Sequence, residues 1–252
     1  MTLNNLFNLD KPLLNIYFSA GYPHLDSLPE ILQSLEKSGV DMVEIGMPYS
    51  DPLSDGPTIQ KSSSIAIKNG ITTDLIFEQI AKSKTSIPKI MMGYFNAVLQ
   101  YGIEQFCIKC NELDIKNLIL PDLPIDVYEE QYKSILDTYG ISLVFLVTPQ
   151  TSVERIHYID KLDSSFIYVV SSSSTTGGSS GLQSSETYLK RIKDMKLQTP
   201  LMIGFNISSN EDFTLACKYA SGAIIGSAFI RHITGSTDLS SDIPQFVQRI
   251  KY

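Results

Sequence analysis

The chain has 252 residues, of which 43% are hydrophobic, so it can bury a sizeable core. Its formal net charge is -7 and its pI is near 5.0. This acidic balance argues against nucleic-acid binding, which usually requires a basic surface, and against membrane-surface binding. The N-terminus lacks a basic start followed by an apolar stretch, and no apolar run approaches the roughly 20 residues that span a bilayer. We therefore expect a soluble, cytoplasmic protein.

Eight apolar stretches predict β-strands, and helix-like segments lie between them. Strands that are apolar on both faces favour a parallel sheet. Eight strand–helix units in about 250 residues predict a (β/α)8 TIM barrel, preceded by a short N-terminal helix. Because no linker or low-complexity tail suggests a division, residues 1–252 are expected to form one domain. The predicted strands are Leu14 to Phe18, Asp41 to Ile45, Lys89 to Met92, Asn117 to Leu120, Ser142 to Leu146, Phe166 to Val170, Leu201 to Gly204 and Gly222 to Ile225.

An open, doubly wound sheet is the competing architecture. Such a sheet normally has a glycine-rich first turn that binds a dinucleotide. The corresponding stretch here, SAGYP at residues 19–23, is not that fingerprint. The closed barrel is therefore the preferred prediction.

The most informative stretch is VEIGMPYSDPLSDGPTIQ at residues 43–60, where an apolar strand runs into a loop with several acids. Glu44 lies at the end of this strand, and a lone carboxylate near an apolar interior either raises its pKa or has a function there. Hydrogen bonding to a neighbouring helix end is the alternative role for Glu44. Asp51 and Asp55 follow in the loop, and the alternative for each is to begin a turn, as Asp-Pro and Asp-Gly commonly do.

Catalytic groups of such barrels lie where strands end and loops begin. No lysine occupies a predicted strand end, because Lys89 and Lys116 stand at strand starts. Schiff-base aldolases need a lysine amine at the reacting carbon, so this class of enzyme is disfavoured. The histidines and the three cysteines form no visible metal site, and the cysteines fall in segments expected to be helical. General acid–base catalysis by carboxylates remains, with Glu44, Asp55 and Asp122 as the candidates.

Three loops predict a phosphate site made of uncharged donors. Loops after the last two strands of these barrels often bind phosphate through backbone N–H groups and a short extra helix. AIIGSAFIRH at residues 223–232 fits this role, with Gly226 allowing close approach and Ser227 offering a hydroxyl and a helix N-cap. GFNISS at 204–209 and TTGG at 175–178 are the other two loops. An ordinary cap is the alternative. The Ser/Thr/Gly-rich segment at 171–181 is either a surface loop or a mobile lid.

These motifs resemble those of the tryptophan synthase alpha chain family. Family members carry a Glu and, eleven residues later, an Asp in a stretch like 43–60, and Glu44 and Asp55 meet that spacing. The resemblance covers nearly the whole chain and continues through MMGYFN, PDLP, STTGG, GFNISS and IIGSA. It implies a lyase of tryptophan biosynthesis that cleaves indole-3-glycerol phosphate to indole and glyceraldehyde 3-phosphate.

The resemblance also implies roles for individual residues. Glu44 would protonate the indole ring carbon and remove the glycerol hydroxyl proton, and Asp55 would hold the indole N–H. A Glu near the apolar mouth has reason for a raised pKa, whereas an Asp in a polar loop should stay ionised. The implied substrate-binding residues are Tyr17, Tyr168, Thr176, Gly177, Asn206, Gly226 and Ser227. Core packing is the alternative for both tyrosines.

Family members work with a beta chain that carries pyridoxal phosphate, so the resemblance implies an alpha2beta2 complex and no cofactor in this chain. No metal is expected. The implied partner contacts are Asp51, Pro52, Asn96 and Pro124.

The sequence departs from the family in the predicted phosphate site. The usual Gly-Phe-Gly reads Gly204, Phe205, Asn206, and the usual Ser-Arg-x-Gly-x-Thr-Gly reads SSSSTTG at 171–177. Asn is the best non-glycine residue for a left-handed backbone position, but its side chain would project toward a phosphate oxygen. The alternative function is therefore a catalytically weakened alpha chain that mainly binds and activates the beta chain. Another phosphate-binding barrel, such as a sugar isomerase, ranks last.

Overall fold

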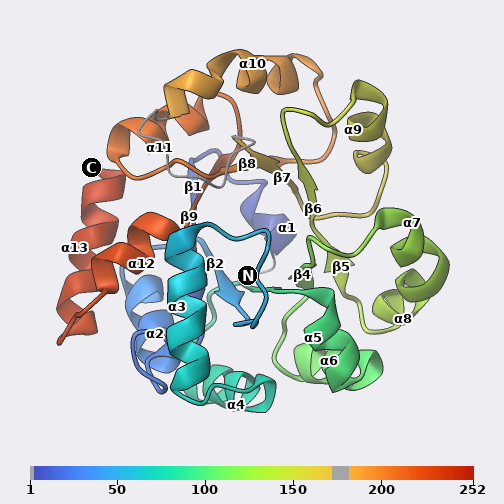
Figure 1. The fold of residues 1–252 in the computed structure, drawn as a ribbon. Helices are drawn as coiled ribbons and strands as arrows, with labels where there is room; N and C mark the ends of the chain where they lie inside the picture. Colours follow the sequence, from blue (N-terminus) through green and yellow to red (C-terminus); the bar gives the residue numbers. More distant parts are fainter. Residues whose placement is uncertain (1–2, 172–181) are drawn as a thin grey trace.

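The computed structural model describes residues 3–171 and 182–252. Within them, nine parallel strands form one sheet in the order β5-β4-β3-β2-β1-β9-β8-β7-β6, which curves into a nearly closed barrel (Figure 1). This confirms the TIM barrel and a strand at each of the eight predicted positions. The strands are β1 Leu13–Ser19, β2 Met42–Gly46, β3 Lys89–Met92, β4 Asn117–Ile119, β5 Ser142–Leu143, β6 Phe145–Val147, β7 Ile167–Val170, β8 Leu201–Gly204 and β9 Gly222–Ile225.

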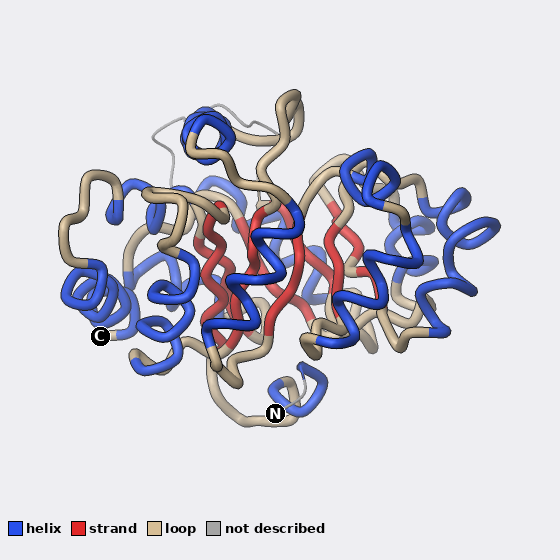
Figure 2. Tube along the Cα trace, turned by 90° about the horizontal axis from the view of Figure 1, so that it is seen from below, coloured by secondary structure: helices blue, strands red, loops and turns tan. Residues whose placement is uncertain are grey.

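Helices surround the barrel, and none in the described ranges is long and apolar enough to cross a membrane (Figures 1 and 2). Helices lie between the strands, as the sequence predicted. The helices are α1 Leu3–Leu6, α2 Leu28–Lys37, α3 Pro57–Lys68, α4 Thr73–Ser83, α5 Phe95–Tyr101, α6 Ile103–Glu112, α7 Ile125–Val127, α8 Lys133–Thr138, α9 Val153–Ile159, α10 Glu186–Asp194, α11 Asn210–Cys217, α12 Ser227–Ile233 and α13 Leu239–Lys251, with a π-helical turn at Tyr128–Tyr132 and a 3-10 turn at Leu182–Ser185.

The fifth barrel strand is divided. β5 pairs with β4, whereas β6 pairs with β7, and Val144 lies between the two segments. The prediction of one continuous strand from Ser142 to Leu146 was therefore wrong in this detail, because an apolar run does not reveal where the pairing partner changes. A cavity of about 270 Å³ adjoins the division and is lined in part by Leu143 and Phe145.

Alternate residues of each strand point into the barrel. Leu13, Met42 and Phe166 belong to an interior apolar cluster that also includes Leu3 and Leu6 of α1. Accordingly, Figure 2 shows α1 beyond one end of the strands. The short N-terminal helix thus closes the amino-terminal end of the barrel, and the opposite end, where strands run into loops, stays open for a site.

The amino-terminal end of the barrel carries charged side chains that stabilise the fold. Lys89 was predicted at this end, at the start of a strand. Lys89 begins β3, and its Nζ donates to the carbonyl oxygens of Thr85 at 3.1 Å and Ile87 at 3.0 Å. At the same end, the buried Asp41 accepts a hydrogen bond from the Leu14 amide at 2.8 Å. These groups hold strand starts and lie away from the loops that follow the strands.

The Phe18→Ala substitution tests the packing between barrel and helices. Phe18 is fully buried, so its truncation should cost about 3–5 kcal/mol and lower Tm by roughly 10 °C for a chain of this size. Thermal unfolding followed by circular dichroism measures this change. Leu53→Ala is the control, because Leu53 is 89% exposed and its truncation should leave Tm nearly unchanged.

Candidate active site

The Glu44 side chain lies inside the barrel. Glu44 is fully buried on β2, in register with Tyr17 of β1 and Ile90 of β3. Asn15 Nδ2 donates a hydrogen bond to Glu44 Oε1 at 2.7 Å. The second oxygen, Oε2, has no hydrogen-bond partner in the described part of the chain. The carboxyl group therefore points neither to bulk water nor to a helix end, which excludes the capping alternative.

Burial determines the protonation of Glu44. Loss of hydration raises its pKa to about 8, while the hydrogen bond from Asn15 opposes that rise. The sequence predicted a raised pKa for this reason. At neutral pH most molecules therefore hold a proton on Glu44, and the group can act first as an acid.

Asp55 lies in the loop between β2 and α3 and is half-buried. Its amide donates to the Pro52 carbonyl oxygen at 3.1 Å, and Gln60 Nε2 donates to the Asp55 carbonyl oxygen at 2.8 Å. Burial raises the pKa of Asp55 to about 6, whereas a hydrogen bond with Tyr94 lowers it. The loop is thus less polar around Asp55 than the sequence suggested, but Asp55 is still mostly ionised at pH 7.

Two tyrosines form walls at the carboxyl ends of the strands. A methyl group added to Gly46 would lie 2.2 Å from the Tyr17 hydroxyl, and one added to Gly226 would lie 3.1 Å from Tyr17 Cδ1. Tyr17 therefore covers the ends of both β2 and β9, which places them at one rim. In the same way, the Tyr168 hydroxyl lies over Gly204 at the end of β8. The rings occupy space that these glycines leave open.

The charges of the two acids act on the hydroxyl groups of the two tyrosines. Burial, followed by the charge of Asp55, raises the pKa of Tyr17 well above its usual range. Burial, followed by the charge of Glu44, does the same for Tyr168. Both acids thus lie near both rings, and the mouth of the barrel combines a neutral acid, a carboxylate and two aromatic walls.

The loop after β8 has the backbone shape that the sequence predicted. Asn206 has φ +57°, a left-handed conformation that Asn adopts more readily than most residues. Phe205 is also left-handed, at φ +73°, which the sequence did not indicate. Ser171 Oγ donates to the Phe205 carbonyl oxygen at 2.8 Å and helps to hold this turn. The predicted substrate-binding residues Thr176 and Gly177 lie outside the described residues.

Gly226 and Ser227 join β9 to α12. The predicted N-cap was Ser227, but the structure has Gly226 at the N-cap and Ser227 as the first helical residue. A glycine cap has no side-chain acceptor for the first-turn N–H groups. Those amides therefore remain able to face an anion at the same rim as Tyr17.

Of the four predicted partner contacts, Asp51, Pro52 and Pro124 lie in loops that follow strands, and Asn96 lies in the first turn of α5. Asp51, Asn96 and Pro124 are exposed, and Pro52 is partly exposed. Asn96 Nδ2 donates to the Tyr49 hydroxyl at 3.0 Å, which ties α5 to the loop after β2. This face therefore offers polar and apolar groups to a neighbour.

Asp122 and Asn15 differ from the sequence-based expectations. Asp122 Oδ1 accepts a hydrogen bond from the Phe95 amide at 2.8 Å, so it holds the start of α5 and has a structural role. Asn15, in contrast, was not predicted to contact Glu44. The available signal was one amide within the apolar strand LLNIYFS. Among the described residues, no cluster of His, Cys, Asp and Glu could hold a metal ion.

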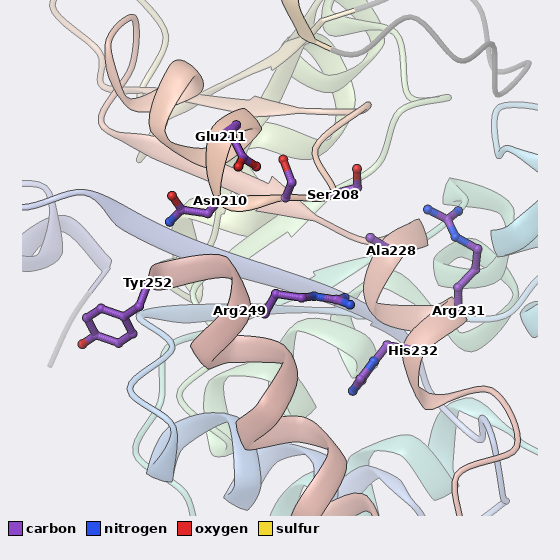
Figure 3. A pocket seen from close by; sticks show the side chains of 9 residues that line it. Ser208, Asn210, Glu211, Ala228, Arg231, His232, Arg249 and Tyr252 are labelled. Carbon is purple, nitrogen blue, oxygen red and sulfur yellow. The ribbon is translucent and has the colours of Figure 1, made fainter.

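A cavity of about 780 Å³ lies among α11, α12 and α13 (Figure 3). Its lining includes Arg231, His232 and Arg249 on one side and Glu211 on another. None of the predicted site residues in the described ranges lines it. The cavity is therefore separate from the Glu44 site.

Comparison with known proteins decides the family. The family model described as tryptophan synthase alpha chain matches residues 3–250. The chain belongs to the tryptophan synthase alpha chain family. It is 52% identical to the tryptophan synthase alpha chain of Christiangramia forsetii over 252 residues, which cover 99% of this chain and 98% of that relative.

Solved structures of this family share the barrel. The tryptophan synthase subunit alpha from Legionella pneumophila is 29% identical, with a TM-score of 0.87 over 99% of this chain and 95% of that one. A chain of the tryptophan synthase complex from Pyrococcus furiosus is 27% identical, with a TM-score of 0.84 over 94% of this chain and 97% of that one. These likenesses extend along nearly the full barrel.

The Glu44→Gln substitution should change how stability depends on pH. The folded pKa of about 8 lies above the ordinary value of 4.5, so the folded state binds this proton more tightly and loses stability as pH rises between those values. The free energy of unfolding of Glu44→Gln, relative to that of the wild-type chain, should therefore rise from pH 5 to pH 8, by at most about 1.4 kcal/mol per pH unit. Thermal unfolding of both proteins across this range measures the effect, and parallel Tm curves would contradict it.

Proposed function

We propose that the chain cleaves indole-3-glycerol phosphate to indole and glyceraldehyde 3-phosphate, as the alpha subunit of tryptophan synthase in tryptophan biosynthesis. Family membership supports this reaction. The observation that carries it is the pair of acids that both act on Tyr17 and Tyr168 at the barrel mouth: the buried Glu44, mostly protonated at neutral pH, and the mostly ionised Asp55. A proton donor and a fixed negative charge are the two groups that this cleavage needs.

Glu44 is proposed to carry the proton in both directions. Its carboxyl group gives a proton to the indole ring carbon that bears the glycerol chain, which leaves a positive charge on the ring. The resulting carboxylate takes the proton from the adjacent glycerol hydroxyl. As the carbonyl of glyceraldehyde 3-phosphate forms, the carbon–carbon bond breaks and its electron pair neutralises the ring. Glu44 ends protonated again, and a pKa of about 8 suits both steps near neutral pH.

Asp55 and the two tyrosines are proposed to place the substrate. The Asp55 carboxylate accepts the indole N–H hydrogen bond and stabilises the positive charge that develops on the ring. Both tyrosines are buried at the mouth. Tyr17 is proposed to offer a flat apolar face to the indole ring, and Tyr168 is proposed to place its hydroxyl on the glycerol side of the substrate. This arrangement puts the ring between the acid that protonates it and the carboxylate that stabilises it.

The phosphate group is proposed to bind at the opposite part of the same rim. Backbone amides near Gly226 and Ser227, with the Asn206 turn, hold an anion without a basic patch, and Thr176 and Gly177 are proposed to contribute from the neighbouring loop. The left-handed turn is kept despite the exchange of Gly for Asn206. Membership of the family favours the active lyase over the weakened alternative.

A tryptophan synthase beta chain is the proposed partner, in an alpha2beta2 complex whose beta chain carries pyridoxal phosphate. A structural neighbour of this chain belongs to a tryptophan synthase complex. Asp51, Pro52, Asn96 and Pro124 are the proposed contacts, and Leu53 beside them is 89% exposed. Indole released at the barrel mouth would then leave on the face that the beta chain covers.

Carboxylate variants test the reaction. In the isolated chain, Glu44→Gln should lower kcat for indole-3-glycerol phosphate by at least about 10²-fold, because general acid–base catalysis contributes that much, and Asp55→Asn should also lower it. Asp51→Asn, which changes an exposed acid of the same loop, is the matched control and should keep wild-type activity. Indole release measures turnover. Wild-type kcat in Glu44→Gln would refute the assigned role.

Binding of the beta chain tests the proposed interface. Asn96→Arg should weaken the Kd for the cognate beta chain by about tenfold or more, since it places a long charged side chain at the proposed contact face. Asn5→Arg makes the same change at the exposed surface of α1, at the amino-terminal end, and should not alter Kd. Isothermal titration calorimetry measures both. If Asn96→Arg and the wild-type chain had the same Kd, the interface would lie elsewhere. If the wild-type chain stimulated the beta chain but released no indole, the alternative function, a weakened alpha chain that activates the beta chain, would be favoured.

A further inference from the structure

A buried amide lies beside the buried acid. Asn15 is fully buried on β1 and lies in register with Met42 of β2 and Ile224 of β9, both in the interior apolar cluster. Its Nδ2 donates to Glu44 Oε1 at 2.7 Å. Since water does not reach either group, this hydrogen bond restricts the rotamer of Glu44. The contact connects β1 to the acid on β2 at the floor of the site.

Packing alone gives a poor account of Asn15. An amide in an apolar interior costs free energy unless its hydrogen bonds are made, and Asn15 Oδ1 has no partner among the described residues. Asn117, a second buried amide, on β4, differs because its Oδ1 accepts a hydrogen bond from Ser165 Oγ at 2.6 Å. Within residues 3–171 and 182–252, the hydrogen bond made by the Asn15 side chain goes to the Glu44 carboxyl group.

The two carboxyl oxygens of Glu44 are therefore not equivalent. Oε1 is occupied by Asn15, whereas Oε2 has no partner in the same part of the chain. We propose that Asn15 is a positioning residue that holds Glu44 through Oε1 and leaves Oε2 as the oxygen that exchanges the proton with the substrate. This inference rests on the proposed function and adds a residue to it.

The same contact affects when Glu44 gives up its proton. An N–H donor stabilises a carboxylate more than a neutral acid, so Asn15 opposes the rise in pKa that burial causes. The charge of Glu44 acts on Tyr17 and Tyr168, and Asp55 acts on the same two hydroxyls; a substitution at Asn15 changes none of these three residues. Loss of the amide should therefore raise the pKa of Glu44 specifically.

The Asn15→Leu variant tests the proposal. A ¹³C NMR titration of the Glu44 carboxyl carbon, assigned with Glu44→Gln, should show its pKa rising by about one unit or more, as expected for loss of a hydrogen bond to a charged group. In steady-state assays with indole-3-glycerol phosphate, the high-pH limb of the kcat profile should move by the same amount. At pH 7, kcat should fall by about tenfold, with KM changed less than about twofold.

Two further variants make the result specific. Asn15→Val removes the same donor with a side chain that strands favour, and it should shift the pKa in the same direction. Asn117→Leu makes the same amide-to-apolar change elsewhere in the barrel interior and should leave the pKa of Glu44 and the kcat profile unchanged, whatever its effect on Tm. A shift of equal size in Asn117→Leu would overturn the proposal.

An unchanged or lowered pKa of Glu44 in both Asn15 variants would also overturn it. The titration needs no substrate, so it separates this inference from the proposed function. If the wild-type chain released no indole at any pH, the proposed function would fail, while the titration would still decide whether Asn15 controls Glu44.

Discussion

Burial of the Glu44 carboxyl group inside the barrel removes it from water, and this loss of hydration raises its pKa to about 8. An uncompensated buried charge would be costly, so at neutral pH the group stays mostly protonated. The strands on both sides of β2 make this burial unavoidable, because alternate residues must point into a closed barrel. The scaffold itself thus produces a neutral acid at the floor of the site, and Asn15 is the neighbour that moderates the effect.

The rim above Glu44 depends on small residues at strand ends. Gly46 and Gly226 leave room for the Tyr17 ring, and Gly204 leaves room for Tyr168. These rings bring three strand ends together around one opening, with Glu44 and Asp55 near enough to raise the pKa of both hydroxyls. Shape and charge at the mouth are therefore linked, since the side chains that wall the opening also exclude water from the acids.

Most of the fold and the acid at its centre could be predicted from the sequence, because apolar strands and a lone Glu in one of them are local signals. Features that depend on contacts between distant segments could not. The division at Val144 depends on which strand pairs with which, and the role of Asp122 depends on the position of Phe95. Asn15 was missed for the same reason, since its importance comes from a residue 29 positions away. Thr176 and Gly177 stay predictions.

The protonation state of Glu44 at neutral pH is the central claim, and infrared difference spectroscopy of the wild-type chain against Glu44→Gln measures it directly. At pH 7 the difference spectrum should contain the carbonyl band of a protonated carboxylic acid, and that band should titrate away with a midpoint near 8. A spectrum with only carboxylate bands at pH 7, titrating near 4.5, would contradict the account.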